Sequence, residues 1–328
     1  MQMSRWSTFP SYVVMLACLA APVLDASAAE IFPVKPIRMV VGFGTGGSAD
    51  VLARLLAPKL SEQLGQPMVV ENRPGASGAI ATERVATAPG DGYTLLLMTV
   101  GDTVIPALRI KLPYDLERDF AAVSLVMSAP FVLVVHPSVP ALNVTELIAL
   151  ARSQPGKLSF GSVGVGSSPH LMAELLNLMA KVKTVHVPYK SGAENVIAVA
   201  SGQIEMYFSS VASLLPLLEA RRIRPLALSS AKRASFMSSI PTLHESGLAG
   251  YDRAAWQGVI APASVPKDIV ARLNATIGKV VNAPDMKESL LKQGLEPQTD
   301  TPEQFAAFIR AEVAANANLI RFIGLKPE

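Results

Sequence analysis

The sequence predicts an α/β protein of two domains, on three observations. At a usual domain size of roughly 150 residues, the 328 residues correspond to about two domains. Half of the residues are apolar and 17% are charged, which supplies buried cores and excludes a mainly disordered chain. Short apolar runs alternate with helix-like segments, a pattern typical of parallel strands joined by helices.

The first 29 residues have the pattern of a secretory signal peptide. Arg5 supplies a positive charge, residues 11–24 form an apolar stretch, and cleavage is expected near Ala28 or Ala29. The stretch is shorter than the roughly 20 residues that cross a bilayer, which argues against a membrane anchor. Cys18, the one cysteine, lies inside this segment. We therefore expect an exported chain without a thiol for disulfides, catalysis or metal binding.

After the signal segment we expect a strand, a glycine-rich loop and a helix in succession. Ile37–Val41 is a short β-branched run, and four glycines lie within residues 42–48. Leucines four apart at 52–64 form one face of the helix, which Pro58 should kink or shorten. Further strands are expected at residues 68–70, 93–98, 122–127 and 131–135, the last two separated by Pro130.

A similar succession occurs in the second half of the chain. It comprises a strand at 158–161, a glycine loop at 162–167, and a helix with Ser168 as N-cap and Pro169 in the first turn. Later strands are expected at residues 184–187, 204–208, 223–228 and 255–260, with helices between them.

The two glycine loops indicate anion binding. Glycines allow the backbone to turn its N–H groups outward, and the helix that follows adds unpaired N–H groups and the positive end of its dipole. In open α/β sheets the ligand binds at the carboxyl ends of the strands, where both loops are placed. Two such loops facing one cleft would hold both ends of a small dianion.

The first loop also fits a second interpretation. Gly42, Gly44 and Gly47 follow a strand and open a helix, and Glu71 ends the next strand, which meets the dinucleotide-binding pattern. An oxidoreductase that uses Gly42–Gly47 to bind a dinucleotide is therefore an alternative hypothesis. Export argues against it, because nicotinamide cofactors are scarce outside the cytoplasm. A third interpretation is that the glycines only form a tight turn.

Composition and spacing exclude several other classes. The net charge of +3 comes without a Lys/Arg block, and aromatic residues are only 6%, so we expect no nucleic-acid partner. The four histidines, His136, His170, His186 and His244, have no metal-ligand spacing, so no metal site is expected. We also expect no cofactor and, without a coiled-coil pattern, a monomer.

An ordered series of segments resembles one family. These segments are Val40–Asp50, residues 71–76, 91–96 and 119–124, Gly161–Leu171, and residues 187–190, 202–205, 241–247 and 256–262. The series is similar to that of the substrate-binding proteins of tripartite tricarboxylate transporters, also called Bug or TctC-type receptors. The resemblance covers essentially the whole chain after the signal segment.

The resemblance implies a periplasmic receptor rather than an enzyme, with a type II-like periplasmic-binding-protein clamshell and a ligand cleft between two domains. We expect a first domain of residues 30–128 plus 252–328 and a second of residues 129–251. The receptor would capture a small organic carboxylate and deliver it to a membrane permease with a large and a small subunit. Presentation of the ligand to a membrane sensor is a further alternative.

In this family, backbone N–H groups, small polar side chains and bridging waters from both loops hold the ligand carboxylates. Carried onto this chain, the resemblance implies as ligand-binding residues Phe43, Thr45, Gly46, Gly47, Ser48, Ser162, Gly164, Gly166, Ser167, His170, Tyr189 and Glu205. Asp50 matches an acidic residue expected to cap the helix. Gly42 and Gly44 stand where the family commonly has proline or another small residue, Glu205 where it usually has aspartate, and Ser191 where it often has glycine. These departures leave the identity of the ligand open.

Overall fold

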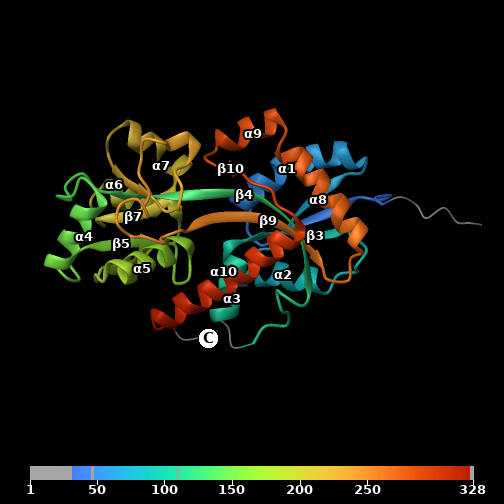
Figure 1. Cartoon of the computed structure of the whole chain (residues 1–328), viewed down its shortest axis with the longest axis horizontal. Coiled ribbons are helices and arrows are strands. Elements are labelled where there is room, and N and C mark those ends of the chain that lie inside the picture. The colour runs from blue at the N-terminus through green and yellow to red at the C-terminus, as the bar shows by residue number, and fades with distance from the viewer. Residues whose placement is uncertain (1–31, 46–47, 109–110, 326–328) are drawn as a thin grey trace, which may run out of the picture. The chain divides into compact units, whose positions relative to one another are not determined.

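The structure, a computed structural model, describes residues 32–45, 48–108 and 111–325 (Figure 1). The expected signal peptide at residues 1–29 lies outside the described residues. Residues 32–328 cluster as one compact unit. Within the described residues, no helix combines the length and the apolar character needed to cross a membrane.

Strands and helices alternate through most of the chain, as the sequence predicts. The described strands are β1 (Ile37–Val41), β2 (Met68–Asn72), β3 (Thr94–Thr99), β4 (Phe120–Val135), β5 (Ser159–Ser162), β6 (Val185–Pro188), β7 (Met206–Ser210), β8 (Arg224–Leu228), β9 (Ala254–Pro262) and β10 (Glu296–Pro297). The described helices are α1 (Ser48–Leu64), α2 (Ala79–Ala86), α3 (Val100–Leu108), α4 (Val144–Ser153), α5 (Ser168–Ala180), α6 (Gly192–Ala200), α7 (Val211–Glu219), α8 (Lys267–Val281), α9 (Pro284–Leu291) and α10 (Pro302–Phe322).

The strands form a path in the order β2-β1-β3-β9-β4-β7-β5-β6, with β8 and β10 also pairing with β4. Strand β1 is parallel to β2 and β3, and β5 is parallel to β6 and β7, as expected for strands joined by helices. Strand β9, however, is antiparallel to β3 and β4, and β4 is antiparallel to β7 and β8. The expectation of parallel strands is therefore wrong for β4 and β9, so the sheet is mixed.

Strand β4 joins the two halves of this path. Its residues 120–130 pair with β9, and residues 131–135 pair with β7 and β8. The sequence predicts two strands separated by Pro130, but the structure has one strand of 16 residues that changes partners at that point. A proline lacks the N–H that a strand donates, so it suits a position where the pairing changes.

The carboxyl ends of the parallel strands lead into helices. Helix α1 follows β1, has 17 residues in all and continues past Pro58, so the expected shortening does not occur. It buries Leu52, Leu56 and Leu60 against the sheet together with Ile277 of α8. Helices α2, α3 and α10 contribute to a second core, which contains Phe305. Helices on both faces thus fix the end of β1, from which the first glycine loop extends.

Helices α3, α5 and α10 meet in a small apolar cluster. Val104 of α3, Leu171 of α5, and Leu319 and Ile320 of α10 are all buried there. Helix α10 also packs along α3, as Figure 1 shows. The helix that follows the second glycine loop is therefore packed against the helix that follows β3.

Candidate functional site

The first glycine loop connects β1 to α1. Of its expected ligand residues, Phe43, Thr45 and Ser48 are described, whereas Gly46 and Gly47 lie outside the described residues. Thr45 and Ser48 are exposed and Phe43 is half-buried. The loop therefore presents a hydroxyl on each side of the two glycines, next to the start of α1.

The Phe43 ring occupies space that two glycines leave open. A Cβ placed on Gly101 would lie 3.7 Å from Phe43 Cζ, and one on Gly78 would lie 3.8 Å from it. These glycines belong to the segments that follow β3 and β2. The first loop is thus in contact with the carboxyl ends of its two neighbouring strands.

A polar network fixes the start of α1. The buried Asp50 accepts hydrogen bonds from Arg54 Nε and from Asn72 Nδ2, each at 2.9 Å. The same Asn72 amide donates to the Phe43 carbonyl at 3.0 Å. A carboxylate in the first turn is also favoured by the helix dipole. These contacts of Asp50 are with the chain itself and hold the loop in place.

The start of α3 is organised in a similar way. Asp102 is buried and accepts hydrogen bonds from the Thr99 backbone N–H at 2.8 Å and the Thr82 hydroxyl at 2.9 Å. Burial raises the pKa of Asp102, although these hydrogen bonds favour its charged form. This carboxyl also lies 3.1 Å from the Cβ position of Gly78, so it borders the space that holds Phe43.

The second glycine loop is closed by its own polar groups. Ser162 Oγ accepts from the Gly164 N–H at 3.0 Å, and Ser167 Oγ donates to the Gly164 carbonyl at 2.7 Å. The Gly166 N–H donates to His170 Nδ1 at 3.2 Å. Four of the expected residues are thus brought together with His170, and the hydroxyls of the two serines bond to the loop backbone.

His186 belongs to this cluster, although sequence reasoning gave it no role. Its Nε2 lies 2.6 Å from Ser162 Oγ, and its ring centroid lies 4.3 Å from that of His170. The ring of Phe160 stacks on both imidazoles. The parallel register of β5 and β6, which pairs Phe160 with His186, produces this contact. No spacing in the sequence could reveal it.

Burial favours the neutral form of both imidazoles. It lowers the pKa of His170 to about 4, and the nearby His186 contributes to the same shift. Burial also lowers the pKa of His186. The Ser162–His186 distance is that of a nucleophile and its base, but Ser162 is fully buried and its hydroxyl is bonded to the loop backbone. This pair therefore supports the loop and has no access to a substrate.

Asparagine side-chain amides donate hydrogen bonds to the backbone of both loops. Asn195 Nδ2 donates to the carbonyls of Ser162 at 3.1 Å and Ser191 at 2.8 Å, which links the end of β5 to the start of α6. It corresponds to Asn72, whose amide holds the Phe43 carbonyl in the first loop. Sequence patterns indicate no role for either residue, because an asparagine that is distant in sequence from the loop it contacts carries no local signal.

The second loop reaches helix α3. A Cβ placed on Gly166 would lie 2.6 Å from Leu108 Cδ1 and 3.7 Å from Val104 Cγ1. Gly166 also has a φ of +79°, a conformation that favours glycine. The loop after β5 is therefore in direct contact with the helix after β3.

The last two expected residues lie in different places. Tyr189 follows β6 and donates its N–H to the Ser162 carbonyl at 2.8 Å, so it adjoins the second loop. Glu205 precedes β7, and its carboxylate accepts from the N–H and the hydroxyl of Ser159, each at 2.7 Å. Ser159 begins β5 and Ser162 ends it, so Glu205 lies at the opposite end of the strand from the loop.

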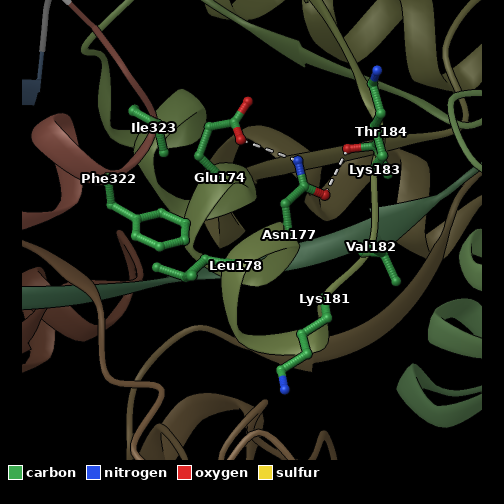
Figure 2. Close-up of a pocket in the computed structure, with 9 residues that line it drawn as sticks. All are labelled: Glu174, Asn177, Leu178, Lys181, Val182, Lys183, Thr184, Phe322 and Ile323. Atoms are coloured by element: carbon green, nitrogen blue, oxygen red, sulfur yellow. Dashed lines mark hydrogen bonds between the residues drawn. The ribbon is translucent and has the colours of Figure 1, made fainter.

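A hollow of about 630 Å³ occurs away from both loops (Figure 2). It is lined by Glu174, Asn177, Leu178, Lys181, Val182, Lys183, Thr184, Phe322 and Ile323. Figure 2 shows the Asn177 amide between Glu174 and Thr184, to which it is hydrogen-bonded. None of the expected ligand residues lines it. Over the described residues, no group of three or more His, Cys, Asp or Glu side chains could hold a metal ion.

The arrangement matches known receptors. The family model described as "Tripartite tricarboxylate transporter family receptor" (TctC) matches residues 52–325. The chain is 33% identical to Protein BugT of Bordetella pertussis, over 99% of each chain.

Two similar solved structures contain carboxylates. Rpa4515 of R. palustris, solved with adipate, is 36% identical with a TM-score of 0.78, over 90% of this chain and 100% of that one. MatC of Rhodopseudomonas palustris, solved with bound malate, is 29% identical with a TM-score of 0.74, over 88% of this chain and 100% of that one. The likeness to these structures confirms the expected fold class, and it does not favour an oxidoreductase. The chain belongs to the TctC family of periplasmic solute-binding receptors, as the resemblance of its motifs predicts.

Proposed function

We propose that this receptor captures a small organic carboxylate between its two glycine loops and delivers it to a permease with a large and a small subunit. The contact of Gly166 with Leu108 carries the proposal, because it brings the second loop to a helix that starts beside the first loop. Helix starts with outward N–H groups suit anions. Adipate in Rpa4515 and malate in MatC support the ligand class.

The proposed ligand contacts are the residues that the loops bring together. In the first loop they are Phe43, Thr45 and Ser48, with the N–H groups of Gly46 and Gly47 as the sequence resemblance implies. In the second they are the backbone around Ser162, Gly164, Gly166 and Ser167, with Tyr189 beside it. His170 positions Gly166. Glu205 stays outside this set because Ser159 occupies its carboxylate.

We further propose two domains, residues 30–128 plus 252–328 and residues 129–251, that close on the ligand. The change of pairing partner at Pro130 supports the first crossing. The pairing of Pro130 with Ala254 supports a second crossing beside the first. Closure would then need backbone rotation at only two adjacent strand positions. Ligand contacts to both loops would shift the population towards the closed form.

The proposed location is the periplasm, reached by a signal peptide of residues 1–29 with cleavage near Ala28 or Ala29. N-terminal sequencing of the protein from a periplasmic extract tests both points. We expect a mature chain that begins at residue 29 or 30. Recovery of the full-length chain in the membrane fraction would contradict the export proposal. Sedimentation of the same material tests the proposed monomer.

Thermal unfolding tests the ligand class. The mature chain is refolded from denaturant to remove bound ligand and heated with adipate, malate, a tricarboxylate, an aromatic acid or NAD(H). A ligand at about 100 times its Kd adds roughly 2.7 kcal/mol, which raises the Tm by several degrees for a chain of this size. A shift with a carboxylate supports the proposal. A shift with NAD(H) alone, abolished by Gly44→Ala, would replace it with the dinucleotide alternative.

Delivery to a permease needs a separate test. Deletion of the receptor gene should abolish growth on the carboxylate identified by thermal unfolding, and the periplasmic form expressed from a plasmid should restore it. Normal uptake without the receptor, with loss of a transcriptional response to the same carboxylate, would instead indicate the sensor alternative.

A further inference from the structure

Two buried amide oxygens have no hydrogen-bond partner in the part of the chain that the structure describes, Asn195 Oδ1 and Gln257 Oε1. Buried polar atoms are nearly always paired, so each exception needs an explanation. Each of these amides also contacts a glycine loop, through Ser162 and Ser48 respectively. Such unpaired groups beside a binding site are candidates for ligand contact.

Asn195 has a structural explanation. Its Nδ2 donates to two backbone carbonyls, which fixes the orientation of the amide, and its Oδ1 packs closely against Gly161. Gln257 has no comparable constraint. Its Nε2 makes one long hydrogen bond of 3.3 Å to the Ser48 hydroxyl, and this hydroxyl belongs to an exposed residue.

Gln257 lies next to the end of the first loop, where α1 starts. It lies in β9, opposite Thr99, the last residue of β3, so it sits at the edge of the sheet where β3 ends and α3 starts. Its side chain is 4% exposed, whereas the adjacent Trp256 packs against Phe305 in the core that α10 contributes to. Because side chains alternate along a strand, Gln257 faces the side on which α1 starts.

The geometry permits a switch of hydrogen bonds. If the amide turns by 180°, its oxygen lies near the Ser48 hydroxyl and its NH₂ group takes the place of the unpaired oxygen. The Ser48 hydroxyl is then the donor to Gln257 Oε1. The NH₂ group then lacks a partner in the protein, and a ligand carboxylate would supply one after displacing the groups that cover this buried position. Both ends of the amide are then satisfied.

We propose that Gln257, which lies beside the first loop, is a ligand-binding residue that donates from Nε2 to an ionised carboxylate of the ligand while the Ser48 hydroxyl donates to its Oε1. The inference rests on the proposed function, which it deepens by naming a side chain and the charged state of the ligand group. In the unliganded protein the amide carries an unpaired buried oxygen. Gln257 therefore lowers the stability of the unliganded protein, and it provides a hydrogen-bond donor to the ligand.

A loss of affinity without a loss of stability therefore distinguishes a ligand contact from a structural residue. Methionine has a similar length and no polar group, so Gln257→Met removes the unpaired oxygen without leaving a cavity. We expect the unliganded Gln257→Met variant to unfold at the same temperature as the parent protein or a higher one. Its affinity for adipate or malate should fall at least tenfold. Gln257→Glu places a carboxylate beside that of the ligand and should lower affinity at least a hundredfold.

The measurements are calorimetric titrations with adipate and malate and thermal unfolding without ligand, on the mature full-length chain. Gln203→Met, at an exposed site, is the control and should leave both properties unchanged. Unchanged affinity in Gln257→Met, or a lower unfolding temperature without ligand, would overturn the inference and leave Gln257 a structural residue. If the parent protein binds neither these two acids nor any other carboxylate, the proposed function fails and this inference with it.

Discussion

The hydroxyl oxygen of Ser162 lies 2.6 Å from Nε2 of His186, which ties the second glycine loop to the neighbouring strand β6. His170 holds the same loop from the other side, through the Gly166 N–H. Because the N–H points at His170 Nδ1, that nitrogen must be unprotonated. Protonation would set two N–H groups against each other, so this contact depends on a neutral His170 imidazole.

Stability should therefore decrease in mild acid. The pKa of His170 is lowered from 6.5 to about 4, so the unfolded chain binds a proton that the folded chain does not. Stability from this group is complete above pH 6.5 and is lost as the pH falls to about 4, by up to about 3 kcal/mol. Urea unfolding between pH 7.5 and 4 measures it. His170→Gln should flatten the curve more than His244→Gln, because His244 is exposed although its Nδ1 also accepts a backbone N–H. An equally steep curve for His170→Gln would contradict the assignment.

Gly166→Ala should weaken ligand binding more than a comparable change elsewhere. The new methyl group would press on Leu108, and the φ of +79° adds roughly 1 kcal/mol of strain for a residue with a Cβ. Gly156→Ala is the matched control, since Gly156 has a φ of +74° and open space around it. Both variants should lose similar backbone stability, but only Gly166→Ala should also lose affinity for the bound carboxylate. Calorimetry on the two variants checks this, and equal affinities would refute it.

Asn72→Ala should loosen the first loop. The change removes hydrogen bonds to the Phe43 carbonyl and to the buried Asp50, at a cost of about 1–3 kcal/mol. Urea unfolding measures the loss, and amide hydrogen exchange should be faster in the residues around Phe43. Asn318→Ala, at an exposed position of α10, is the control. If the two variants are equally stable, the network around Asp50 does not depend on Asn72.

Two glycine substitutions should act in opposite directions. A Cβ on Gly258 would lie 2.7 Å from Phe305 Cε1 and 2.8 Å from the Ser124 carbonyl, so Gly258→Ala forces the core apart and should cost about 1–3 kcal/mol. Gly278 lies inside α8 with open space around it, so Gly278→Ala should stabilise the protein by roughly 0.5–1 kcal/mol. Thermal unfolding of both variants measures these changes in stability. A stable Gly258→Ala would mean that β9 can shift.

Local patterns in the sequence predicted much of the fold. The run Ile37–Val41 is β1 as expected, and α5 has Pro169 in its first turn as expected, although Ser167 rather than Ser168 is its N-cap. Both glycine loops lie where the alternation of strands and helices placed them. The expectation of parallel strands was wrong for β4 and β9. Strand direction depends on which distant strands pair with each other, and no short window of sequence contains that information.

What the sequence by itself determined is the order of elements, the two glycine loops and, through the ordered motifs, the TctC family. The tertiary structure alone decided which side chains surround those loops. Asn72, His186, Asn195 and Gln257 reach them from separate strands and helices, by register and packing. It also separated Glu205 from the second loop, because opposite ends of β5 are three residues apart in sequence but face opposite edges of the sheet. Contacts between distant segments are set by the three-dimensional arrangement of strands, which local propensities do not encode.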